Sequence, residues 1–222
     1  MLSMQKQFLF IHVPKTGGNS LQNILSHYSE DKIVIHGKHQ DGIERFEVRN
    51  DNYEVTKHST LKHYQEILEA DIYQKLFKFA TIRNPYDQMI SWYFSPHRGV
   101  NEWVRQDFIY LIEEVPTLRE YIGLPTTSFL KKMTTKFGLS LKLKPPKLDR
   151  NIDFLIRFEH LNEDFKKVCG MIDIPYEPLP IRNKSQRKHY SAYFDEEIKE
   201  RVYLKFREEI KFGGYEFDEG KS

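Results

Sequence analysis

A short loop near the N-terminus carries the residues best suited to bind an anion. Lys15, Gly17 and Gly18 lie in the stretch FLFIHVPKTGGNSLQNIL, residues 8–25, which has the pattern of a buried strand, a tight loop and an amphipathic helix. The first N–H groups of a helix have no partners within it, and the helix dipole adds partial positive charge there. The lysine adds a full charge, and the glycines let the backbone approach a ligand closely. We therefore expect a phosphate- or sulfate-like group here. Three polar neighbours offer further donors: Thr16, Asn19 and Ser20.

A second stretch, FATIRNPYDQMISWYF at residues 79–94, places an arginine just after a strand-like run. Asn84 is a suitable helix N-cap and Pro85 a suitable first helical residue, so Ser91 falls about two turns into the predicted helix. Arginine offers a rigid fork of donors that suits phosphate. From these residues alone, Arg83 could equally pair with a carboxylate, and Ser91 could merely pack.

The elements that position these residues alternate between strands and helices. Strand-like runs occupy four stretches: 8–13, 32–36, 77–82 and 153–158. Helical apolar patterns follow three of them, and further helices are expected at 61–68, at 104–112 and from Asp195 to the Gly213–Gly214 pair. This alternation predicts an α/β fold with a central parallel sheet flanked by helices. Residues 37–57 are polar and poorly patterned, and we expect a mobile loop there.

The order of the elements also predicts where a ligand binds. In parallel α/β sheets, ligands bind at the carboxyl ends of the strands. Lys15 and Arg83 each follow the end of a predicted strand. We therefore expect both side chains to face the same crevice.

Composition restricts the class of protein. A chain of 222 residues, 39% hydrophobic, suits one domain spanning 1–222, and a net charge of +2 gives no sign of nucleic-acid binding. The single cysteine, Cys169, excludes an intrachain disulfide and is expected to pack in a helix. No secretory signal and no apolar run of about 18 residues is present, so we expect a cytoplasmic protein without a membrane span. No His/Cys cluster suggests a metal.

The loop differs from that of nucleotide triphosphatases. Their motif, G-x-x-x-x-G-K-[ST], places lysine after the last glycine. Here Lys15 precedes both glycines. Two alternative functions remain. One is a P-loop-type kinase, which would need magnesium, and the other is a non-catalytic nucleotide-binding module.

Taken together, three motifs resemble those of sulfotransferases that use 3′-phosphoadenosine-5′-phosphosulfate. They are HVPKTGGNS at 12–20, KHST at 57–60 and FATIRNPYDQMISWY at 79–93, with weaker support from 179–198 and 212–217. The resemblance is greatest to the carbohydrate branch, which includes the heparan-sulfate 2-O and chondroitin enzymes. It implies a P-loop-like three-layer fold. It also implies in-line transfer of a sulfuryl group to an acceptor hydroxyl, the acceptor being a carbohydrate or another small molecule, with adenosine 3′,5′-bisphosphate as the product.

The resemblance also implies roles for individual residues. The loop from Lys15 to Ser20 would hold the 5′-phosphosulfate through Lys15, Thr16, Gly17, Gly18, Asn19 and Ser20. Arg83 and Ser91 would bind the 3′-phosphate, with Ser185 and Arg187 as weaker candidates for the same side. Lys15 would also meet the charge that grows on the leaving oxygen. Asp87 and Gln88 receive no role.

The acceptor hydroxyl needs a base, and the resemblance implies His58, in KHST, for that role. Histidine titrates near neutral pH without a large shift. His12 lies inside a predicted strand and is expected to be structural. Three other histidines are weaker rivals: His36, His39 and His97.

Two further features stay open at this point. Residues 131–150 hold seven basic residues against one acid, and they could form either a surface for an anionic acceptor or a solvated loop. Trp92, Tyr93 and Trp103 could stack on a base or a sugar, although core packing is their commoner role. The sequence identifies neither the acceptor nor the oligomeric state.

Overall fold

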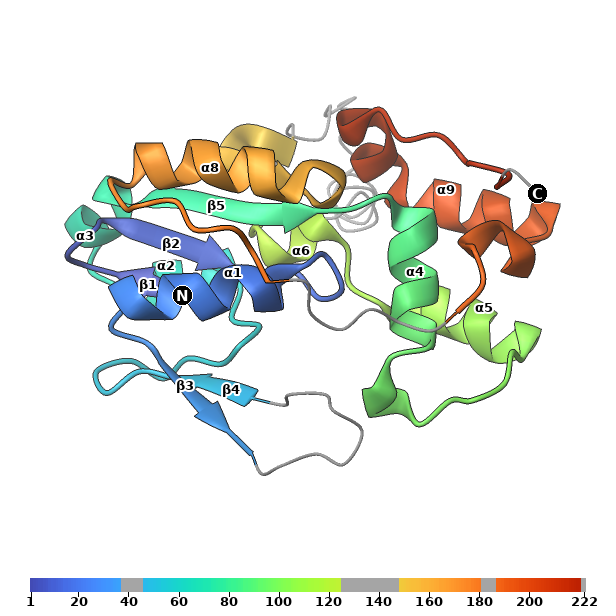
Figure 1. Cartoon of the computed structure of the whole chain (residues 1–222), viewed down its shortest axis with the longest axis horizontal. Helices are drawn as coiled ribbons and strands as arrows, with labels where there is room; N and C mark the ends of the chain where they lie inside the picture. The colour runs from blue at the N-terminus through green and yellow to red at the C-terminus, as the bar shows by residue number, and fades with distance from the viewer. Residues whose placement is uncertain (37–45, 125–147, 181–186, 221–222) are drawn as a thin grey trace, which may run out of the picture.

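The computed structural model describes residues 1–36, 46–124, 148–180 and 187–220 (Figure 1). Its centre is a four-stranded sheet in the order β1-β2-β5-β6. The strands are β1 (Leu2–Ser3), β2 (Phe8–Ile11), β5 (Phe77–Ile82) and β6 (Phe154–Arg157). β5 pairs in parallel with both β2 and β6, whereas β1 is an antiparallel edge strand. The predicted α/β class is therefore confirmed, with one antiparallel strand added to the parallel sheet.

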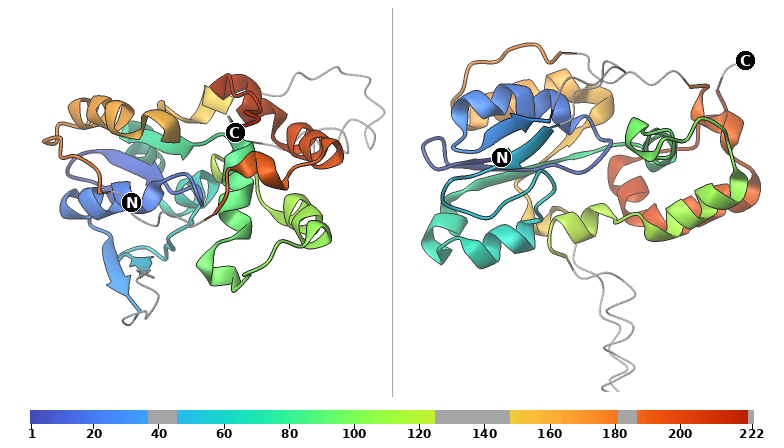
Figure 2. Two further views of the ribbon diagram at one scale, coloured as in Figure 1. Left: turned by 45° about the vertical axis from the view of Figure 1, so that its right-hand side comes forward. Right: turned by 90° about the horizontal axis from the view of Figure 1, so that it is seen from below.

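Helices cover both faces of this sheet. One face carries α1 (Gly18–Leu25) and α8 (Leu161–Met171), and the other carries α2 (Leu61–Ile67) and α3 (Ala70–Lys75) (Figures 1 and 2). A parallel sheet covered on both sides needs strands that are apolar throughout. β2 meets this requirement, since all four of its residues are buried. Cys169 is buried in α8, as expected, and burial raises the pKa of its thiol to about 11.

A second hydrophobic cluster lies beside the sheet. It joins α4 (Pro85–Tyr93), α5 (Arg105–Glu114) and α9 (Glu196–Gly213) with the short helix η5 (Tyr190–Tyr193). The predicted helix signals are confirmed here: the Asn84 side chain accepts a hydrogen bond from Tyr86 N, and α9 ends at Gly214 with a φ of 64°. The remaining short helices are η1 (Ser26–Tyr28), η2 (Pro96–Arg98), α6 (Leu118–Tyr121), η3 (Leu148–Asn151) and η4 (Phe158–His160).

One strand prediction and one loop prediction need correction. β3 (Lys32–Ile35) does not join the central sheet but pairs antiparallel with β4 (Phe46–Arg49) in a separate two-stranded sheet. β4 falls inside the stretch expected to be loop, and residues 37–45 of that stretch lie outside the described residues. The physical reason is the burial pattern. β4 alternates buried and exposed residues, and β3 is only partly covered, so this hairpin needs a single apolar face.

No helix in the described ranges has the length and apolar character needed to cross a membrane. Within the same ranges, no group of three or more histidine, cysteine or acidic side chains is arranged to hold a metal ion.

Candidate functional site

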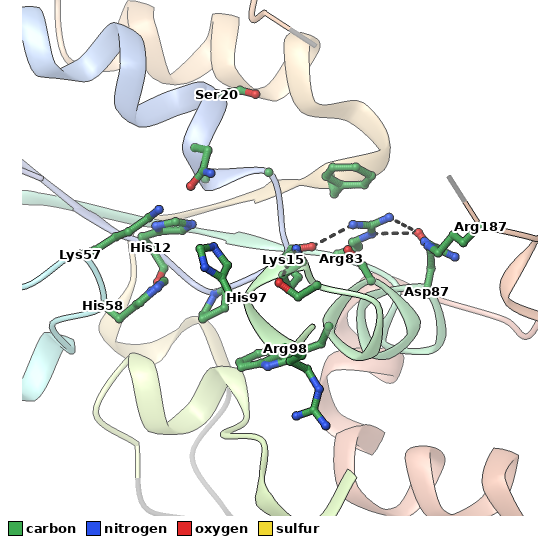
Figure 3. A pocket seen from close by; sticks show the side chains of 18 of the residues that line it. His12, Lys15, Ser20, Lys57, His58, Arg83, Asp87, His97, Arg98 and Arg187 are labelled. Atoms are coloured by element: carbon green, nitrogen blue, oxygen red, sulfur yellow. Dashed lines mark hydrogen bonds and ion pairs between the residues drawn. The ribbon is translucent and has the colours of Figure 1, made fainter. Parts of the chain in front are cut away.

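The two predicted anion-binding stretches meet in one cavity of about 970 Å³. It lies where β2 and β5 end, as the strand order led us to expect. Most of the predicted site residues line it: Lys15, Gly17, Gly18, Asn19, Ser20, His58, Arg83, Ser91 and Arg187. Ser185 lies outside the described residues, as does most of the basic stretch 131–150. Figure 3 shows an arginine end and a histidine end, with Lys15 between them.

The loop before α1 has an unusual backbone. Lys15 and Gly17 both adopt the left-handed conformation, with φ values of 65° and 88°. Gly17 is the N-cap of α1, so the start of the helix opens on the cavity. At Gly18 a Cβ atom would lie 2.1 Å from the ring of buried His12, so only glycine fits there. Because Gly17, Gly18 and Asn19 line the cavity, the first residues of α1 lie at the cavity wall.

The hydroxyl groups of Thr16 and Ser20 hold the loop in place through hydrogen bonds to neighbouring segments. Thr16 does not line the cavity; its Oγ1 donates to Val13 O at 2.7 Å and is hydrogen-bonded to Thr81 Oγ1 of β5. Ser20 lines the cavity, but its Oγ donates to Pro180 O at 2.8 Å. Gln88 of α4 holds the loop from the other side by donating from Nε2 to Pro14 O at 2.9 Å. These bonds fix the loop against the sheet and α4.

The electrostatics around Lys15 favour an anionic ligand. The pKa of Lys15 is lowered to about 8; burial is the largest cause, and the nearby charges of Arg83, Lys57 and Arg187 contribute to the same shift. The Lys15 ammonium reaches Ser95 Oγ at 3.5 Å. A bound anion would offset this crowding of positive charge. The cavity is therefore suited to a ligand with more than one negative charge.

Arg83 pairs with a carboxylate, as one of its two interpretations predicts, and it also lines the cavity. Its Nε donates to Asp87 Oδ2 at 2.9 Å, and its Nη1 donates to Lys15 O at 2.9 Å. Its guanidinium lies 3.9 Å from the centre of the Phe158 ring. Asp87 also binds Arg187, which comes from the C-terminal part of the chain (Figure 3).

The histidine end contains His58 and His12, with ring centres 4.8 Å apart. The Nδ1 of His58 lies 3.2 Å from the carbonyl oxygen of His12. Because a carbonyl oxygen only accepts, this contact assigns the proton of neutral His58 to Nδ1 and leaves Nε2 able to accept a proton. Burial is the largest cause that lowers the pKa of His58, and the hydrogen bond with the His12 carbonyl raises this pKa in part. His58 is therefore neutral at neutral pH.

The cavity also includes residues for which the sequence predicts no main role in the site. His12 is buried, as expected of a structural residue, yet it lines the cavity; its place directly before the loop could have indicated this. Lys57 adjoins His58, whereas Arg98 and Phe158 come from distant segments. His97, a weaker rival to His58, and Trp92, a candidate for stacking on a base or a sugar, also line the cavity. By contrast, Tyr93 and Trp103 pack in the helical cluster, and His36 is exposed away from the cavity. His39 lies outside the described residues.

Comparison with known proteins identifies a family. A family model described as the sulfotransferase family matches residues 1–128. No curated protein and no solved structure matches the chain significantly. The matched residues include the loop at 15–20, His58, Arg83 and Ser91, and they leave out Phe158 and Arg187.

Proposed function

The chain belongs to the sulfotransferase family, and on that premise we propose that it transfers a sulfuryl group from 3′-phosphoadenosine-5′-phosphosulfate to a hydroxyl of a carbohydrate acceptor. The observation that carries the proposal is the meeting of three groups in one cavity: the Lys15 loop, Arg83 and His58. Tyr121 of the core around the sheet and Trp92 beside the helical cluster both line the cavity, so we also propose that the whole chain acts as one domain.

The cavity residues suit the two charged ends of this donor. The loop and the start of α1 offer backbone N–H groups to the 5′-phosphosulfate, next to the Lys15 ammonium. Arg83 and Ser91 would bind the 3′-phosphate, with Arg187 beside them. When bound, the donor supplies the sulfuryl group; the protein contributes position and charge.

Two side chains have assigned parts in the reaction. We propose that Nε2 of His58 takes the proton of the acceptor hydroxyl, since Nδ1 is committed to the His12 carbonyl. Lys15 would stabilise the negative charge on the leaving oxygen, because its ammonium lies in the cavity and contacts Ser95 Oγ before the reaction begins. No metal is required by this scheme.

Binding of adenosine 3′,5′-bisphosphate should weaken above about pH 8. The pKa of Lys15 is lowered to about 8 in the free protein, so above that pH the free lysine is neutral. An anion favours the charged form, so binding is strongest below the free-protein pKa and falls by up to about tenfold per pH unit above it. Titration calorimetry from pH 7 to 9.5 measures this, because the phosphates keep constant charge there. The Lys15→Arg variant should show a flatter profile. A flat profile for the unaltered protein would contradict the assignment of Lys15.

Transfer itself is tested with donor carrying ³⁵S. Incubation with a panel of glycans and small hydroxylated compounds should move label to at least one acceptor and release adenosine 3′,5′-bisphosphate in equal amount. A parallel incubation with γ-³²P-labelled ATP and Mg²⁺ tests for a kinase. Label transferred only from ATP would replace the proposal with phosphoryl transfer. Tight binding of the bisphosphate without transfer to any acceptor would favour a non-catalytic nucleotide-binding module.

A further inference from the structure

We infer that Asp87 is a positioning residue that holds Arg83 and Arg187 in place for the 3′-phosphate and so connects the C-terminal part of the chain to the nucleotide site. The inference rests on the proposed function, because it concerns the same ligand. It assigns a task to a carboxylate that would otherwise oppose an anion on the cavity wall.

The contacts of Asp87 divide between its two oxygens. Oδ2 accepts from Nε and Nη2 of Arg83, and Oδ1 accepts from Nη2 of Arg187. The two arginine side chains are only 11% and 10% exposed, and that of Asp87 is 24% exposed. All three residues line the cavity. One carboxylate therefore bridges two arginines at the site where a phosphate is expected.

The cluster of Arg83, Asp87 and Arg187 connects three separate segments of the chain. Arg83 follows β5, and its Nη1 donates to the carbonyl of Lys15 in the loop after β2. Asp87 lies on α4, four residues before Ser91, so these two share one face of the helix. Arg187 brings in the segment that precedes η5. The cluster thus links the loop, α4 and the C-terminal part.

Fixing the arginines in advance matters for binding. An arginine side chain loses much rotamer freedom when a ligand immobilises it, and affinity improves when that loss has already occurred. Burial opposes ionisation of Asp87, but the charges of Arg83 and Arg187 outweigh it and lower the pKa of the carboxyl. Asp87 is therefore ionised at neutral pH and keeps both contacts.

A different role for Asp87 would give the opposite result. If the carboxylate only balanced the charge of the two arginines, it would repel the incoming phosphate. Its removal would then tighten binding. The sign of the change in affinity therefore separates positioning from charge balance.

The test compares Asp87→Asn and Asp87→Glu with the unaltered protein by titration calorimetry. The two probes are adenosine 3′,5′-bisphosphate and adenosine 5′-monophosphate, which lacks the 3′-phosphate. We expect Asp87→Asn to weaken binding of the bisphosphate about tenfold while changing binding of the monophosphate less than about twofold. Asp87→Glu, which keeps the carboxylate, should recover part of the loss. Glu66→Gln is the matched control, since Glu66 forms an exposed i,i+4 pair with Lys62 away from the cavity.

Equal weakening for both ligands would overturn the inference, because it would indicate a general effect on the fold. Unchanged or tighter binding of the bisphosphate would overturn it as well. If Asp87→Asn fails to fold, Asp87→Glu carries the test by the same comparison of ligands. Failure of the proposed function looks different: the unaltered protein would then bind the bisphosphate no better than the monophosphate.

Discussion

Replacement of His58 by alanine is expected to reduce turnover by about 10²- to 10⁴-fold, the usual contribution of a positioned general base. The affinity for adenosine 3′,5′-bisphosphate should stay within about twofold, because the proposed anion contacts come from the Lys15 loop and the arginine end of the cavity. Steady-state rates with labelled donor, together with calorimetry on the bisphosphate, measure the two quantities separately.

The pH profile gives a second readout for the same residue. His58 must be neutral to accept a proton, and its pKa is lowered from the ordinary histidine value, mainly by burial. Activity should therefore persist at neutral pH and fall only as the pH drops through this lowered pKa. The His58→Ala variant should not show this fall in activity at low pH. His63→Ala is the matched control, since the His63 ring contacts Glu54 O at 2.6 Å and does not line the cavity. A His58→Ala enzyme with normal turnover would remove His58 from the mechanism.

Replacement of Lys15 by alanine should reduce turnover by about 10²- to 10³-fold, as loss of a preorganised charge at a developing anion does in other enzymes. The ammonium is largely enclosed by protein and close to Arg83, so its loss also removes part of the attraction for the donor. Both kcat and the affinity for the bisphosphate should therefore fall, in contrast to the His58 variant. Rates and binding are measured as above.

Two further variants test whether the effect depends on the Lys15 ammonium itself. Lys15→Arg keeps the charge but changes its geometry, and should retain more affinity than turnover. Lys6→Ala removes a lysine that pairs with Asp173 away from the cavity, and should behave as the unaltered protein does. A Lys15→Ala enzyme that loses affinity but keeps its kcat would limit Lys15 to ground-state binding.

The sequence predicts those parts of the site whose residues lie close to one another in the chain. The strand, the loop and the helix around Lys15 follow one another without interruption, and so do the strand, Arg83 and the N-cap Asn84. Short-range patterns of this kind report backbone geometry directly. The rule that parallel strands present their carboxyl ends together then placed Lys15 and Arg83 in one cavity, and the Arg83 contact with Lys15 O agrees with it.

Other parts of the site depend on contacts between distant segments. The Phe158 ring reaches Arg83 from η4, and Arg187 reaches Asp87 across 100 residues of chain. Nothing in the sequence near Asp87 indicates that its partners include a residue so far away. The strand β3 was misplaced for a related reason: its apolar run resembles a buried strand, but its pairing partner β4 lies in a polar stretch. Which apolar runs share a sheet is decided by tertiary packing.

The central sheet has a consequence for how this chain can be divided. The region that identifies the family stops at residue 128, yet β6 is the neighbour of β5, and α9 supplies much of the apolar cover of α4 and α5. A polypeptide cut at that point would leave the backbone edge of β5 unpaired and uncover one side of both helices. The residues that match the family model are thus fewer than the residues that complete the central sheet and cover α4 and α5.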